Sequence, residues 1–159
     1  MKRRDVMTNC LALMLASRYA PALAHHGWSS FDQDRPIYLE GRVTKSVWQN
    51  PHAELVIDVP AALKLPADLA QRALPAQTAP VDGKGLLTRA VVPARQDKRW
   101  EIELAPIGRM QAWGVAEIQP GDSIAVLGFT FAGEKGAAVL RVEYLFAAGK
   151  TYALRSSPP

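Results

Sequence analysis

The stretch IYLEGRVTKSVW, residues 37–48, decides the fold. Apolar and polar residues alternate along it, which is the pattern of a half-buried β-strand. The alternation predicts an inward row made of Ile37, Leu39, Val43 and Val47. Gly41 interrupts this row, and a glycine inside a strand is typical of a bulge or of the tight bend at a barrel corner.

Further strands are predicted outward from this stretch. After a turn at Asn50-Pro51, HAELVIDV alternates with His52 on the polar side, beside Glu54 and Asp58. A helix is expected over 106–118. The remaining predicted strands are 99–105, 123–131 and 137–147.

The order of three strands, a helix and two strands is the order of an OB-fold. We therefore predict a mainly β protein, a small OB-fold-like five-stranded barrel with one short helix between strands 3 and 4. The alternative is a small β-sandwich with an attached helix.

The segment 60–98 has a different composition, rich in Ala, Pro, Gln and Lys. It is predicted to be an insertion in a single domain over 25–159, with a short helical turn near 66–73. So long a connection inside a compact domain is usually mobile or functional.

Residues 1–24 have the order of a secretory signal peptide: a basic start, an apolar run from Cys10 to Ala16, then Pro21 and small residues. Cleavage after Ala24 places Ala22 and Ala24 at the −3 and −1 positions. The run is too short to span a bilayer, so no membrane span is expected after cleavage. We predict a periplasmic or secreted protein. An amphipathic N-terminal helix is the alternative, and the Arg3-Arg4 pair leaves the export route open.

Charge and cysteine content exclude several function classes. The formal net charge is +4, but four basic residues lie in the first 24, which leaves 15 basic and 14 acidic residues in the body. No nucleic-acid partner is therefore expected. Cys10 is the only cysteine, so the body has no disulfide, zinc-thiolate site or cysteine nucleophile.

Enzymatic activity is not expected either. No nucleophile elbow and no phosphate-binding loop is present. Glu101 and Glu103 alternate on one face of a predicted strand, where paired acids usually form a solvated surface.

The three histidines of the chain are His25, His26 and His52. Cleavage after Ala24 makes His25 the first residue, whose amine and ring can chelate one metal ion together. A site rich in nitrogen suits copper best among the first-row divalent metals. This pattern is similar to the histidine brace of exported copper proteins, in which a terminal histidine supplies its amine and ring and a second histidine supplies another ring. His52 is the candidate for the second histidine.

A brace of this kind requires the N-terminal arm to run back along the first strand. It can do so as an added strand, and Trp28 and Phe31 are expected to anchor it. The alternative is that the paired histidines form a solvated tail and that His52 only satisfies its turn by hydrogen bonds.

Several motifs together resemble an exported bacterial family described as a domain of unknown function. They are A-H-H (24–26), F-D (31–32), G-x-V (41–43), W-x-N-P-H (48–52), W-E-I-E-L (100–104) and P-G-D (120–122). The resemblance implies a periplasmic or secreted small β-barrel with His25, His26 and His52 as motif positions, but it implies no activity. The chain departs from the pattern at Gly27, where the family more often has serine, and in its long insertion, which is expected to cover or extend a binding face.

The sequence thus favours a periplasmic metal-binding protein, a copper carrier or buffer whose partners are the metal ion and another periplasmic protein. The alternative is an OB-fold module without metal that binds an oligosaccharide or a protein. In that case the contacts would come from tryptophans: Trp28, Trp48, Trp100 and Trp113. The alternation places Trp100 in the core instead.

Overall fold

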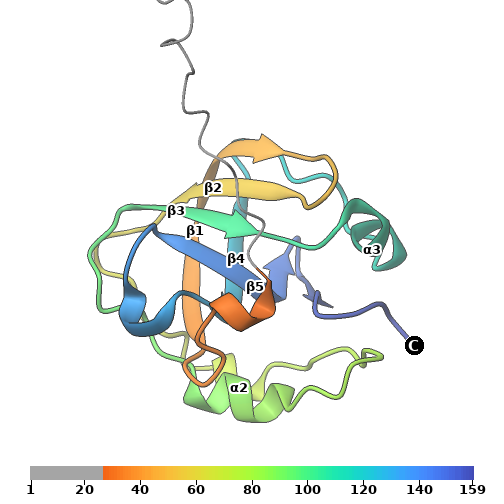
Figure 1. Cartoon of the computed structure of the whole chain (residues 1–159), viewed down its shortest axis with the longest axis horizontal. Coiled ribbons are helices and arrows are strands. Elements are labelled where there is room, and N and C mark those ends of the chain that lie inside the picture. Colours follow the sequence, from red (N-terminus) through yellow and green to blue (C-terminus); the bar gives the residue numbers. More distant parts are fainter. Residues whose placement is uncertain (1–26) are drawn as a thin grey trace, which may run out of the picture.

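The computed structural model describes residues 27–159 (Figure 1). The predicted signal peptide and two of the candidate ligands, His25 and His26, lie outside the described residues.

Five strands form a closed barrel (Figure 1). Antiparallel pairings join β1 to β2 and β4, β2 to β3, and β4 to β5. A parallel pairing between β3 and β5 closes the barrel. The strands are β1 (Ile37–Val47), β2 (Glu54–Asp58), β3 (Arg99–Glu103), β4 (Ser123–Phe129) and β5 (Val139–Ala147).

The predicted OB-fold-like barrel is confirmed, and its closure excludes the sandwich. Helix α3 (Ile107–Ala112) lies between β3 and β4 as expected, although it is shorter than predicted. A sixth strand, β6 (Lys150–Ala153), extends β5 into a hairpin that the sequence did not predict. The remaining elements are η1 (Trp28–Ser30), η2 (Leu69–Gln71), α2 (Gly83–Arg89) and η3 (Ala132–Glu134). No helix in residues 27–159 is long and apolar enough to cross a membrane.

Gly41 lies where β1 changes partner, since residues 37–42 pair with β4 and residues 42–47 pair with β2. The backbone of β2 approaches so closely here that a Cβ on Gly41 would overlap the Asp58 carbonyl group. Gly41 therefore supplies the barrel bend. The bulge lies elsewhere, at Thr44, where the β1–β2 register shifts.

This bulge reverses the inward row of β1. Beyond Thr44, Ser46 pairs with the core residue Leu55 and faces inward, whereas Val47 pairs with Glu54 and faces outward. The prediction that Val47 faces inward is wrong, because the extra residue shifts the alternation by one position. Trp48 now packs against the core.

Two hydrophobic cores hold the fold together. The first fills the barrel around Trp100, which is fully buried as predicted. The second lies outside the barrel, where Leu69, Leu86 and Leu87 of the insertion pack against β1, β4 and β5. Figure 1 shows α2 beneath the barrel. The predicted helical turn at 66–73 corresponds to η2, while α2, capped by the Asp82 side chain, was not predicted.

We expect Gly41→Ala to lower the free energy of unfolding by about 1–3 kcal/mol, because β2 would have to move to admit a methyl group. Gly108→Ala is the control, since a Cβ at that α3 position meets nothing within 4 Å. That variant should remain within about 1 kcal/mol of wild type or gain stability. Urea unfolding measures both. Equal stability of the two variants would contradict the proposed role of the bend.

Candidate functional site around His52

The strand registers align four side chains across the outer face of the barrel. Val47 pairs with Glu54, Glu54 with Glu103, and Glu103 with Arg141. The strand neighbours of Glu54, Glu103 and Arg141 are core residues, so this row faces away from the barrel interior. His52 has the same parity as Glu54, in agreement with the sequence alternation.

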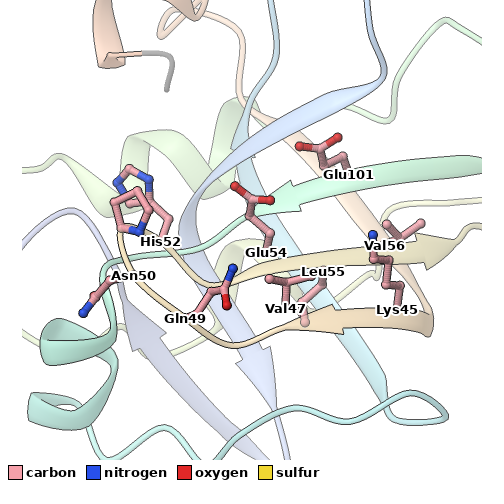
Figure 2. A pocket seen from close by; sticks show the side chains of 10 residues that line it. Lys45, Val47, Gln49, Asn50, His52, Glu54, Leu55, Val56 and Glu101 are labelled. Atoms are coloured by element: carbon pink, nitrogen blue, oxygen red, sulfur yellow. The ribbon is translucent and has the colours of Figure 1, made fainter. Parts of the chain in front are cut away.

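A hollow of about 330 Å³ lies along this face, over β1, β2 and the middle of β3. Figure 2 shows the His52, Glu54 and Glu101 side chains pointing to the same side of the sheet. The turn that carries His52 contains a cis bond between Asn50 and Pro51. The lining residues, none of them Phe, Tyr or Trp, are Lys45, Val47, Gln49, Asn50, Pro51, His52, Glu54, Leu55, Val56 and Glu101.

Arg141 joins His52 to a buried carboxylate. Its Nη1 atom donates to Glu103 Oε2 at 3.2 Å, and its Nη2 atom lies 3.2 Å from His52 Nε2. The side chains of Arg141 and Glu103 are only 8% and 9% exposed. The expectation that Glu103 belongs to a solvated surface is therefore wrong, because Glu103 is buried together with Arg141.

The contact with Arg141 fixes the tautomer of a neutral His52 ring. A guanidinium has five donors and no acceptor, so Arg141 must donate to His52 Nε2. The Nε2 atom therefore carries the lone pair, and Nδ1 carries the proton.

Trp28 covers Arg141 from the N-terminal side. The Trp28 ring centroid lies 3.7 Å from Arg155 Cζ and 5.1 Å from Arg141 Cζ, and the Phe129 ring meets it edge-on at 6.3 Å. Cations over the face of tryptophan are attracted by the ring quadrupole. This contact holds the first described residues against the same row as His52.

The second predicted anchor is also in place. Phe31 is buried and stacks on Phe131 with ring centroids 5.1 Å apart. The backbone N–H of Asp32 donates to the Thr130 carbonyl. The described part of the arm begins with the short helix η1 instead of the added strand that was considered.

Arg155 connects this arm to the rest of the molecule. It contacts Glu143 Oε2 at 2.7 Å and donates to Gln33 Oε1 at 2.8 Å. Glu143 is fully buried, and Gln77 of the insertion donates to its other oxygen. Gln77 also accepts a hydrogen bond from the Ser156 backbone. The insertion and the C-terminal segment thus support the stack on Trp28.

Sequence reasoning missed Arg141, Glu143 and Arg155. Arg141 and Glu143 alternate with apolar residues in the predicted strand 137–147, and this pattern is read as a polar outward face. The only signal was that these charges lie among many apolar neighbours. Their burial depends on long-range packing of the arm and the tail, which alternation does not reveal.

The tryptophans offer little as binding platforms. Trp48 and Trp113 are partly buried against the hydrophobic cores, and the Trp113 indole donates to the Ser156 carbonyl at 2.8 Å.

The structure brings the start of the described chain close to His52. Arg141 Cζ lies 5.1 Å from the Trp28 ring centroid, and the same guanidinium contacts His52 Nε2 at 3.2 Å, so one arginine joins the two side chains. Within residues 27–159, no group of three His, Cys, Asp or Glu side chains is placed to hold a metal ion.

Comparison with known proteins gives a family likeness without an activity. The profile of a family of unknown function, DUF6152, matches residues 12–64 of the 159-residue chain. The resemblance to a domain of unknown function is thereby confirmed. The matched stretch contains all three histidines. No curated protein matches the chain.

Burial raises the pKa of Glu143, against the opposing effects of Arg155 and Gln77. The protonated form therefore favours the fold. This stabilisation is fully present below the pKa of an unfolded glutamate, about 4.3, and is lost as pH rises through the raised pKa of the folded state. Glu143→Gln mimics the protonated side chain, so its stability relative to wild type should increase over that pH window.

Urea unfolding between pH 4 and pH 8 measures this difference. Glu117→Gln, at an exposed position, is the matched control and should follow wild type. A Glu143→Gln variant whose stability differs from wild type by a constant amount across the range would contradict the assignment.

Proposed function

We propose that the mature protein begins at His25, is periplasmic or secreted, and binds one copper ion as a carrier or buffer without catalysing a reaction. The ligands would be the amine and ring of His25 and the ring of His52, with His26 as a further candidate. The observation that carries the proposal is the stack of Trp28 on Arg141 beside His52.

This stack supports the proposal because it limits the position of the terminus. A free tail would lose much conformational entropy on reaching a remote ring. An arm already packed through Trp28 and Phe31 has lost most of that entropy on folding.

The donor chemistry supports copper. A neutral imidazole and a deprotonated amine are nitrogen donors, and Cu(II) binds such donors more strongly than the other first-row divalent ions. The body offers no thiolate that would favour zinc or Cu(I), because Cys10 precedes the proposed cleavage site.

A second candidate function is a binding module for another periplasmic protein. The hollow beside His52 favours it, since OB-folds bind ligands over strands 2 and 3 and their loops. Its lining combines amide and charged groups with small apolar patches. An oligosaccharide is less well supported than a protein, because no Phe, Tyr or Trp side chain lines the hollow.

The metal proposal is tested with protein whose chain starts at His25. His52→Ala and an added alanine before His25 should each weaken Cu(II) binding about tenfold or more, since each removes a ligand or its geometry. Gln49→Ala, in the same hollow, is the control and should bind like wild type. Competition with a chelator of known affinity measures all four proteins.

Unchanged affinity in both the His52 and the extended variants would refute the proposed ligand set. Binding of a protein partner that is lost on changes at Lys45 or Glu101, but is indifferent to the terminus, would support the second candidate instead.

A further inference from the structure

The contact between Arg141 and His52 has a consequence for the metal site. A metal ion binds a histidine nitrogen through its lone pair. Arg141 Nη2 lies 3.2 Å from Nε2 and can only donate, so in a neutral His52 ring the lone pair is on Nε2. The atom that would bind a metal is therefore already occupied by a hydrogen-bond donor.

Arg141 is held firmly in this position. Glu103 accepts from its other nitrogen, Trp28 covers its face, and only 8% of its side chain is exposed. A guanidinium cannot lose its proton in a protein, so it cannot become an acceptor for a protonated Nε2 atom. Arg141 and a metal ion thus cannot use His52 Nε2 at the same time.

We infer that Arg141 is a latch that competes with the metal ion for His52, and this inference rests on the proposed function. In the metal-free protein, Arg141 holds the His52 ring in its position and in one tautomer. Binding of the metal requires Arg141 to withdraw toward Glu103, and release of the metal allows it to return. Such competition lowers affinity and offers a route for passing the ion on, which suits a carrier better than a permanent cofactor site.

Because Arg141 forms an ion pair with Glu103, a variant that removes the Arg141–His52 contact must change both residues. Arg141→Met alone would leave the buried Glu103 carboxylate without its arginine, which destabilises the fold. The double variant Arg141→Met/Glu103→Gln removes both charges together. Arg99→Met is the matched control, because Arg99 forms an exposed ion pair with Asp58 on β2.

The experiment measures the apparent Cu(II) dissociation constant of protein that begins at His25, by competition with a chelator. The double variant should bind about tenfold tighter than wild type, the order expected for loss of one charge-assisted hydrogen bond. The Arg99→Met variant should match wild type. Equal or weaker binding by a folded double variant, while wild type binds, overturns the latch and leaves the proposed function standing.

Nitrogen NMR of the metal-free protein provides a second readout that needs no copper. Wild type should show His52 with the proton on Nδ1 and a hydrogen-bonded Nε2 atom, and the double variant should lose the Nε2 hydrogen bond. A wild-type ring protonated on Nε2 overturns the latch. If the expected tautomer is present but no variant binds Cu(II), the proposed function fails, and the competition fails with it.

Discussion

The buried ion pair between Arg141 and Glu103 is the interaction on which the arrangement of this face depends. Charges on an outward strand face are normally solvated, and removing them from water is costly unless they are paired and covered. Here β3 and β5 run parallel and place the two side chains directly opposite each other. Trp28 covers Arg141, and Arg141 also contacts His52. The chain just after the proposed mature terminus is therefore held by the same arginine that contacts His52.

A second charged pair extends this constraint to the distant parts of the chain. Arg155 contacts the buried Glu143. Like Arg141, it also lies over the Trp28 ring. Gln77 connects Glu143 to the insertion. The insertion therefore does more than fill a second core, because it helps to hold the N-terminal arm. Its position under the barrel leaves the hollow beside His52 on a different face.

Much of the barrel could be predicted from the sequence, because alternation in residues 37–48, 99–105 and 137–147 reports which face is buried. Gly41 correctly indicated the bend. Alternation failed at Thr44, where one extra residue reversed the row, since a bulge leaves little trace in a single sequence. It also failed for β6 and α2, which are short and depend on tertiary packing.

The site was predictable only in part, for a related reason. The outward parity of His52 followed from the strand pattern, and Trp28 and Phe31 were recognised as anchors. The arginines that organise these residues were not, because their roles come from contacts between segments more than a hundred residues apart. Local patterns report a side chain's direction, and they do not report what covers it.

We propose that the terminal histidine and His52 share one copper ion. Electron–nuclear double resonance of the Cu(II)-loaded protein, with its chain starting at His25, tests this most directly. We expect nitrogen couplings from an amine and from imidazole rings, with one imidazole set absent in His52→Ala. A spectrum with couplings from the terminal residue alone, identical in wild type and His52→Ala, would contradict it.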